Sequence, residues 1–280
     1  MQKIKMIGLD LDGTLLTSEK KLTAYTKSII KRALDEGIVV LVATGRPYTG
    51  IPQELRDISK MRYALTSNGA RILDTWTGEV LIEQLFPLES AKKALAIFYK
   101  YDTLQEVYFD GQGYVDKDLY DQVERFHHNP FMWEYFRESR KPVPSMEELI
   151  AEKDCDMDKV QALFADVSQK QAAWDELAQH KEFELVNSLG YNIEINAAGV
   201  NKGTGLVRLG EMLGIRREEI MACGDSDNDI TMLSEVGFGV AMANAHDEVK
   251  AAADYITESN DNDGVAKAIE RFALKGESIC

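Results

Sequence analysis

The chain has 280 residues, of which 45% are hydrophobic and 28% charged, and its formal net charge at pH 7 is -15. This is the make-up of a globular protein long enough for one large domain or two smaller ones. The acidic excess argues against a nucleic-acid or anionic-membrane surface, because both need clustered Lys and Arg to neutralise phosphate. We therefore expect neither nucleic acid nor a membrane as a partner.

The cysteines and the apolar runs favour a reducing, cytoplasmic location. The three cysteines are Cys155, Cys223 and Cys280. They lie far apart without Cys-x-x-Cys spacing, so they indicate neither a disulfide framework nor a zinc site. The first apolar stretch meets Asp10 too early for the core of a secretory signal. The longest uninterrupted apolar run, at 38–43, is far shorter than the ~20 residues that cross a bilayer.

The first eighty residues alternate strand and helix patterns. Residues 5–10 and 38–46 are predicted to be buried strands, and residues 22–37 have apolar side chains at helical spacing before a helix-stopping glycine. Continuous apolar strands separated by amphipathic helices favour a parallel sheet covered on both faces, because a half-exposed strand would alternate.

The same alternation returns near the C-terminus. We expect helices at 202–215, 229–236, 247–253 and 264–274, and strands at 218–225, 238–242 and 254–257. The two ends of the chain therefore predict one discontinuous α/β domain, residues 1–83 and 197–280, with a Rossmann-like parallel sheet.

The middle of the chain, residues 84–196, has a different pattern. Hairpin-like alternation occurs at 105–118 and again at 183–199, each with a glycine-containing turn, and helical patterns at 89–101 and 171–179 lie between them. Structureless loops of this length are rare in compact proteins, so we expect an inserted α+β domain.

Asp10 and Asp12 directly follow the first predicted strand. Residues i and i+2 of a strand share a face, so both carboxylates can address one point beyond the sheet edge, and Gly13 lets the backbone turn. An ordinary turn with solvated carboxylates would use the same residue types. The pair alone does not decide between these interpretations.

Two further motifs could bind an anion. VATGRP ends a buried strand on Thr44, Gly45 and Arg46, although a strand-to-loop turn stopped by Pro47 would have the same residues. NKGTG places Lys202 in the first turn of a predicted helix, where free N–H groups bind anions and a cation is electrostatically unfavourable.

A fourth motif, CGDSDNDITM, places three aspartates within five residues after a predicted strand; they are Asp225, Asp227 and Asp229. Their spacing matches calcium-loop positions one, three and five, but the sixth position is Ile230 and the twelfth is Val236, so an EF-hand is excluded. The remaining interpretation is a magnesium-type site, completed by a carboxylate such as Asp10 from elsewhere.

The four motifs are more informative together. Ligands of open parallel sheets bind outside the carboxyl ends of the strands; three motifs follow strands and the fourth opens a helix. Together they supply a carboxylate nucleophile, an acid/base, phosphate-binding groups and a metal site, which is a set of parts for phosphoryl transfer.

LDLDGTLL, ATGRPY, NKGTG and GDSDNDITM, in that order, resemble the motifs of the haloacid dehalogenase-like superfamily and, within it, of the Cof-type sugar-phosphate phosphatases. The resemblance extends to SNGA at 67–70, VAMANA at 240–245 and the segment 259–270. It covers both core halves and is weak across the middle. Thr44 is an accepted alternative to Ser in this family.

The resemblance implies a mechanism. Asp10 would attack phosphorus and form an aspartyl-phosphate, while Asp12 would protonate the leaving alcohol and then deprotonate the hydrolytic water. Mg²⁺ would be held by Asp10, the backbone carbonyl of Asp12 and Asp225. The inserted domain would be a cap that excludes water and reads a small phosphate monoester, such as a sugar phosphate.

The resemblance also implies roles for further residues. The catalytic set would include Thr44 and Lys202, and Asp229 would orient Lys202 or the metal loop. The residues that bind phosphate or substrate would be Leu11, Thr44, Gly45, Arg46, Lys202 and Asn228. Asp227 is interpreted as a solvated loop carboxylate.

Two other functions remain open at this point. A phosphotransferase or phosphomutase would pass the same aspartyl-phosphate to a sugar hydroxyl, and a metabolite-binding module would keep the fold without turnover. For any of these functions, we expect the protein to be a monomer or a homodimer. The presence of both Asp10 and Asp12 argues against the non-catalytic module.

Overall fold

The computed structural model describes residues 3–277, which divide into two compact units. Within the described range, the first unit contains residues 3–45, 51–82 and 201–277, and the second contains residues 46–50 and 83–200. The chain thus enters the first unit, leaves it and returns, and each unit has its own sheet.

The first unit is built on an eight-stranded sheet in the order β14-β13-β12-β1-β2-β3-β4-β5. Its strands are β1 (Met6–Leu9), β2 (Val39–Ala43), β3 (Tyr63–Thr66), β4 (Arg71–Asp74), β5 (Val80–Glu83), β12 (Ile220–Gly224), β13 (Phe238–Ala241) and β14 (Tyr255–Ile256). The pairings from β14 through β1 to β3 are parallel. The predicted α/β class with a parallel sheet is therefore confirmed.

One edge of this sheet departs from the expected parallel arrangement. β4 runs antiparallel to β3, because the chain reverses through the short 3-10 helix η2 (Ser67–Gly69) instead of crossing over through a long helix. Asn68, at φ 58°, and Gly69, at φ 102°, adopt the left-handed conformations that this tight reversal requires.

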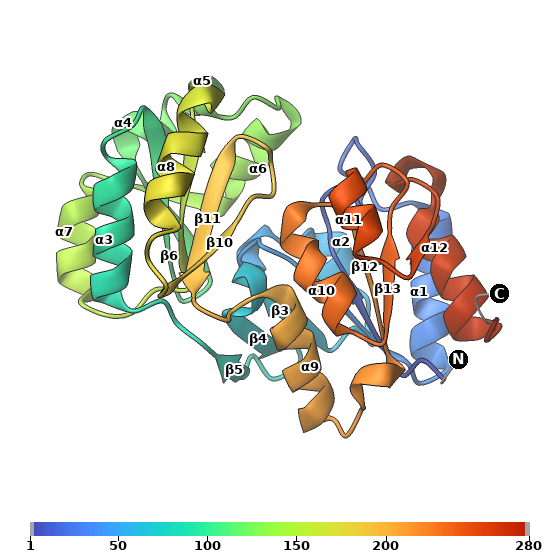
Figure 1. The fold of residues 1–280 in the computed structure, drawn as a ribbon. Coiled ribbons are helices and arrows are strands. Elements are labelled where there is room, and N and C mark those ends of the chain that lie inside the picture. The colour runs from blue at the N-terminus through green and yellow to red at the C-terminus, as the bar shows by residue number, and fades with distance from the viewer. Residues whose placement is uncertain (1–2, 278–280) are drawn as a thin grey trace. The chain divides into compact units, whose positions relative to one another are not determined.

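Helices cover both faces of the sheet (Figure 1). They are α1 (Ala24–Asp35), α2 (Gln53–Arg56), α9 (Lys202–Met212), α10 (Ile230–Glu235), α11 (Asp247–Ala251) and α12 (Gly264–Ala268), which a π-helical segment (Ile269–Leu274) continues. α9 and α10 pack on one face against Met6 and Leu41, and on the other face Phe272 meets Phe238 with ring centroids 4.8 Å apart. Strands that are buried on both faces explain the uninterrupted apolar runs in the sequence.

The second unit contains a six-stranded sheet in the order β10-β11-β9-β6-β7-β8. Its strands are β6 (Thr103–Phe109), β7 (Gln112–Asp116), β8 (Arg140–Val143), β9 (Lys159–Phe164), β10 (Phe183–Val186) and β11 (Asn192–Ala197). Its helices are α3 (Leu88–Phe98), α4 (Lys117–Tyr120), α5 (Val123–Phe126), α6 (Phe131–Ser139), α7 (Met146–Lys153) and α8 (Lys170–Leu177). Both predicted hairpins, β6–β7 and β10–β11, are confirmed as antiparallel pairs.

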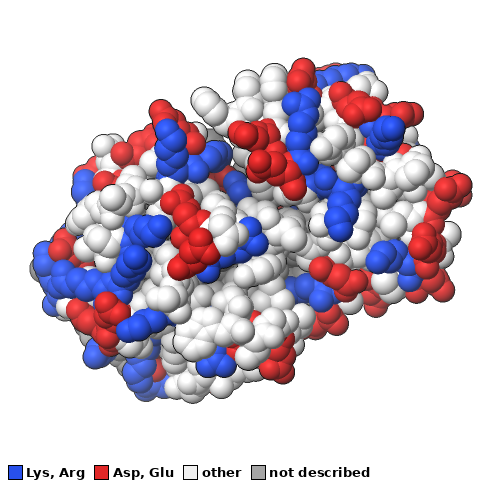
Figure 2. All heavy atoms as spheres, turned by 180° about the vertical axis from the view of Figure 1, so that it is seen from behind, with Lys and Arg blue, Asp and Glu red and all other residues white. Residues whose placement is uncertain are grey.

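The surface charges and the thiols complete this description. No helix within residues 3–277 is long and apolar enough to cross a membrane. On the face drawn in Figure 2, Lys and Arg side chains alternate with Asp and Glu rather than forming one basic patch. Cys155 is exposed and Cys223 is buried, both with free thiols, whereas Cys280 lies outside the described residues.

The core of the second unit yields a stability prediction. Phe98 on α3 is fully buried and packs edge-on against Phe164, with ring centroids 6.4 Å apart. Phe98→Ala should lower the free energy of unfolding by about 3–5 kcal/mol, because it removes buried apolar surface and leaves a cavity. Urea unfolding followed by tryptophan fluorescence measures this.

The matched control is Tyr99→Ala, one residue further along and 55% exposed. This change should alter the free energy of unfolding by no more than about 0.5 kcal/mol. Equal effects of the two substitutions would contradict the described packing of α3.

Candidate active site

Three of the predicted motifs meet at one edge of the first unit's sheet. Asp10 follows β1, Thr44 follows β2 and Asp225 follows β12. β1 lies between the other two strands, and Leu9 is in register with both Val42 and Cys223. Because all three strands are parallel, their carboxyl ends bring these residues to the same edge.

Lys202 joins this edge from α9. The helix begins at Lys202 because the Asn201 side chain caps it, accepting a hydrogen bond from the backbone N–H of Thr204 at 2.9 Å. Lys202 is fully buried, and its ammonium donates to Asp10 Oδ1 at 2.6 Å and to Asp229 Oδ1 at 2.8 Å. A cation at a helix start, unfavourable by itself, is stabilised here by two carboxylates.

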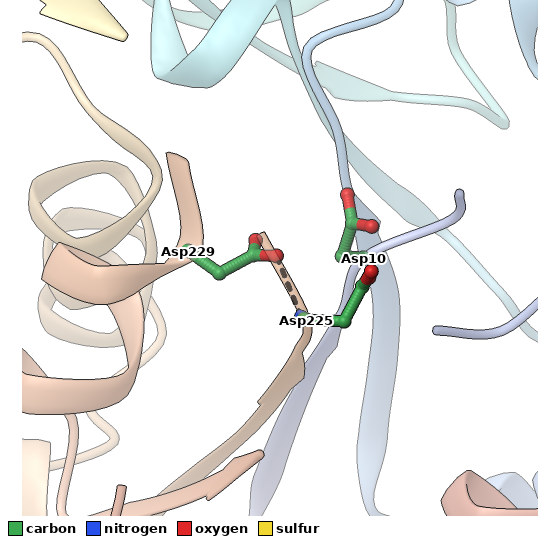
Figure 3. Close-up of side chains that lie close together, drawn as sticks. All are labelled: Asp10, Asp225 and Asp229. Atoms are coloured by element: carbon green, nitrogen blue, oxygen red, sulfur yellow. Dashed lines mark hydrogen bonds between the residues drawn. The ribbon is translucent and has the colours of Figure 1, made fainter. Parts of the chain in front are cut away.

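Asp229 contacts both Lys202 and the loop after β12. Its Oδ2 accepts hydrogen bonds from the backbone N–H groups of Asp225, at 2.9 Å, and Ser226, at 3.1 Å; Figure 3 marks the first of these. Gly224 permits this approach, because a Cβ there would lie 2.4 Å from the Cβ of Asp229. A larger residue at 224 would displace Asp229 and, with it, a partner of Lys202.

Asp10, Asp225 and Asp229 form a carboxylate cluster, each offering one oxygen within 4.8 Å of the others (Figure 3). Thr14 Oγ1 donates to Asp225 Oδ1 at 2.7 Å, while Gly13, at φ 84°, leaves room for Oδ2, which would lie 2.2 Å from a Cβ at that position. Grouped carboxylate oxygens are the donor set of a hard divalent cation such as Mg²⁺. The residues present therefore fit a metal ion.

Within the cluster, the three aspartates are not equivalent as ligands. Both Asp229 oxygens already accept hydrogen bonds, one from Lys202 and the other from backbone N–H groups. In Asp10 and Asp225, by contrast, it is Oδ1 that accepts the side-chain hydrogen bond, from Lys202 and from Thr14, and the two residues directly follow the adjacent strands β1 and β12. This division favours Asp10 and Asp225 as ligands and Asp229 as the residue that holds Lys202 and the loop.

Burial and like charge perturb the carboxylates. Burial raises the pKa of Asp10 to about 7, with contributions from Asp229 and Asp12 and a partly offsetting effect of Lys202. Burial, followed by the charges of Asp10 and Asp229, also raises the pKa of Asp225 well above its usual range. Burial by itself would lower the pKa of Lys202, but the two neighbouring carboxylates raise it above its ordinary value. The ammonium thus stays charged, while burial and the neighbouring carboxylates favour the protonated, neutral form of Asp10 and Asp225.

Thr44 and Asn228 are also buried near this edge, together with a residue that sequence reasoning did not single out. Asn68 accepts a hydrogen bond from Asn228 Nδ2 on its Oδ1 at 3.3 Å, and its backbone N–H donates to the carbonyl of Thr44 at 3.0 Å. Asn68 therefore links the two anion-binding candidates. The sequence signal for Asn68 was SNGA at 67–70. This segment was part of the family resemblance, but no chemical role had been assigned to it.

The argument that strand alternation pairs Asp12 with Asp10 does not apply. β1 ends at Leu9, before the aspartate pair, so strand alternation does not place the two carboxylates on one face. Asp12 Oδ1 instead accepts from Lys20 Nζ at 2.7 Å, and Asp12 is not one of the three clustered carboxylates. The argument from strand periodicity was therefore wrong for this pair, because the strand is shorter than the apolar run.

The remaining predicted residues differ in their surroundings. The Leu11 side chain is fully buried, so only its backbone could meet a ligand, and Asp227 is exposed. Arg46 donates to the carbonyl of Gly50 at 2.8 Å, and its guanidinium lies 3.9 Å from the centroid of the Tyr135 ring. These contacts place Arg46 in the second unit, whereas Gly45 belongs to the first.

The raised pKa of Asp10 predicts how stability depends on pH without a metal ion. Its folded-state pKa, about 7, exceeds its ordinary value of 3.8, so its contribution to stability is complete below the ordinary value and is lost as pH rises through 7. In EDTA, the native protein should lose more stability between about pH 4 and pH 7 than Asp10→Asn, with a limiting slope of ~1.4 kcal/mol per pH unit for one proton.

Urea unfolding at several pH values measures this difference. Asn is the matched control, since its oxygen can still accept from Lys202 while the side chain cannot ionise. Parallel pH profiles for the two proteins would show that Asp10 is not held protonated by its burial.

Comparison with known proteins agrees with this geometry. A family model described as haloacid dehalogenase-like hydrolase matches residues 7–269. The chain is 34% identical over 277 residues to the 5-amino-6-(5-phospho-D-ribitylamino)uracil phosphatase YcsE of Bacillus subtilis, covering 97% of this chain and 96% of that protein.

Solved structures show the same relationship. A haloacid dehalogenase-like hydrolase from B. subtilis superposes with a TM-score of 0.86 at 28% identity, covering 95% of this chain and 99% of that one. The subclass IIB sugar phosphatase BT4131 superposes with a TM-score of 0.83 at 26% identity, covering 96% and 99%.

Proposed function

The chain belongs to the haloacid dehalogenase-like hydrolases and is a phosphoric monoester hydrolase, and we propose that it hydrolyses small sugar phosphates with Mg²⁺ through an aspartyl-phosphate on Asp10. The observation that carries the proposal is the buried Lys202 ammonium between Asp10 and Asp229, beside Asp225. It combines a carboxylate nucleophile, a fixed cation and metal-binding oxygens in one place.

Asp10 is the proposed nucleophile. Lys202 holds its Oδ1, which leaves Oδ2 for attack on phosphorus. Asp10 and Asp225, with the backbone carbonyl of Asp12, would hold Mg²⁺, which when bound supplies positive charge to the phosphate oxygens. A metal ion would also keep Asp10 ionised at neutral pH, against the raised pKa that burial imposes.

The proton transfers are assigned to Asp12. It donates a proton to the leaving alcohol when Asp10 attacks, and it accepts a proton from water when the aspartyl-phosphate is hydrolysed. Lys202, Thr44, Gly45 and Asn228 hold the transferring phosphoryl group, through an ammonium, a hydroxyl, a backbone N–H and an amide. Asp229 keeps Lys202 in place.

The substrate class is a separate part of the proposal. We propose that the second unit acts as a cap, which excludes water and reads the alcohol part of the substrate. Support comes from the relatives: one is named a phosphatase of a phosphorylated ribityl compound, and another a sugar phosphatase. The substrate classes in both names carry a polyhydroxylated chain or ring, so phosphorylated polyols and sugars form the first panel to test.

Asp10→Asn tests the catalytic proposal. Phosphate release should be measured over sugar phosphates, phosphoglycolate, pyridoxal phosphate and flavin mononucleotide, with and without Mg²⁺. We expect Mg²⁺-dependent turnover by the native protein and a loss of about a thousandfold or more in Asp10→Asn, because the amide is a poor nucleophile. Asp227→Asn, in the same motif as Asp225 but exposed, should retain activity.

Two results would count against this proposal. Turnover that survives Asp10→Asn would remove Asp10 as the nucleophile. Release of phosphate without oxygen from ¹⁸O-labelled water, or appearance of the phosphoryl group on a second sugar, would instead identify a phosphotransferase or phosphomutase that uses the same residue.

A further inference from the structure

Lys20 makes a contact that the proposed mechanism does not use. Its ammonium donates to Asp12 Oδ1 at 2.7 Å, and the two side chains are 24% and 25% exposed. Partly exposed ion pairs of this kind contribute little to the stability of a fold. Stability alone therefore does not explain why Lys20 contacts Asp12, the carboxylate to which the proton transfers are assigned.

The backbone at Lys20 is in an unfavourable conformation for its residue type. Its φ is 62°, in the left-handed region that glycine adopts more readily than lysine. This conformation closes a tight loop in which Lys20 N–H donates to the Thr17 carbonyl at 2.8 Å and Thr17 N–H donates to the Lys21 carbonyl at 3.0 Å. Unfavourable backbone at a candidate site is a reason to look for a functional role of the side chain.

The loop is also fixed to the rest of the first unit. The backbone N–H and the hydroxyl of Ser18 donate to the two carboxylate oxygens of Asp261, at 2.8 and 2.7 Å. Asn260 Nδ2 donates to the carbonyl of Leu16 at 3.0 Å. These bonds hold both the start and the middle of the loop, so the Lys20 ammonium is presented to Asp12 from a fixed backbone.

We propose that Lys20 is a positioning residue for Asp12, which orients the carboxyl group so that Oδ2 is the oxygen that carries the proton. An ammonium group only donates hydrogen bonds, so the oxygen it contacts must act as the acceptor. A proton on Asp12 is then carried by Oδ2, the oxygen that Lys20 does not contact. The inference rests on the proposed role of Asp12 in hydrolysis.

The proton movements balance over the two steps. In the first, Asp10 Oδ2 forms a bond to phosphorus, the bond from phosphorus to the leaving oxygen breaks, and the Asp12 Oδ2 proton passes to that oxygen, giving the free alcohol. In the second, water attacks the aspartyl-phosphate, its proton returns to Asp12 Oδ2, and the bond from Asp10 to phosphorus breaks to release phosphate.

Leaving-group dependence separates this role from a structural one. An alkyl leaving group needs the proton, whereas p-nitrophenolate leaves without it. Lys20→Met should therefore lower kcat/KM about tenfold or more for a sugar phosphate that the native protein hydrolyses, and less than about threefold for p-nitrophenyl phosphate. Lys20→Arg should recover part of the loss, because it restores a donor to Oδ1.

Two control measurements complete the experiment. Lys21→Met removes the neighbouring lysine, which forms an exposed ion pair with Glu19, and should change neither substrate's kcat/KM. Lys20→Gly should unfold at the same temperature as the native protein or higher, because φ 62° suits glycine, while losing the same activity as Lys20→Met. A double substitution with Asp12→Asn should show no further loss from Lys20→Met.

Failure of the inference and failure of the proposed function are distinguishable. Equal losses on both substrates, or no loss on either, would overturn the role of Lys20 while the native protein and Asp10→Asn still behave as a phosphatase and its inactive variant. Absence of turnover by the native protein on every sugar phosphate of the panel and on p-nitrophenyl phosphate would overturn the proposed function and, with it, the assignment of Asp12.

Discussion

The candidate site depends on one buried ammonium surrounded by carboxylates. Lys202 is fully buried and contacts both Asp10 and Asp229, with Asp225 in the same cluster. One positive charge does not balance three aspartates, so burial and mutual repulsion raise the pKa values of Asp10 and Asp225. A bound metal cation would offset this imbalance, and the phosphate group of a substrate would then meet positive charge at its oxygens in a net acidic protein.

The fold is what makes that arrangement possible. Parallel pairing of β1 with β2 and β12 brings residues distant in the chain to one sheet edge, and α9 starts with Lys202 at the same place. Two glycines provide the space: Gly13 beside the Asp225 carboxylate and Gly224 beside Asp229. The site therefore lies at the carboxyl ends of the strands, and a few residues of the following turns complete it.

Much of this could be predicted from the sequence, because strand-end motifs have local patterns. The apolar run before Asp10, the acidic cluster after β12 and Lys202 at a helix start each appear within a few residues. The parallel sheet then follows from buried strands alternating with helices. Periodicity could not show where β1 ends. The strand ends at Leu9, one residue before its predicted end, so strand alternation does not apply to Asp10 and Asp12.

The contacts that were missed are side-chain contacts between distant segments or in irregular loops. Asn68 meets Asn228 across 160 positions, and Arg46 lies over the ring of Tyr135, which is also distant in the sequence. Lys20 contacts Asp12 from a left-handed backbone conformation that nothing in its residue type indicates. Such contacts depend on tertiary packing, so a pattern of hydrophobic and polar residues has no signal for them.

The most direct test of the central claim is chemical trapping of the phosphorylated residue. The native protein would be mixed rapidly with a hydrolysed substrate and Mg²⁺, quenched in acid and treated with borohydride, which reduces an aspartyl-phosphate to homoserine. Peptide mass spectrometry should find homoserine at position 10. Homoserine at position 12 or 225 instead, or none at any aspartate during a burst of phosphate release, would contradict the account of Asp10 as the nucleophile.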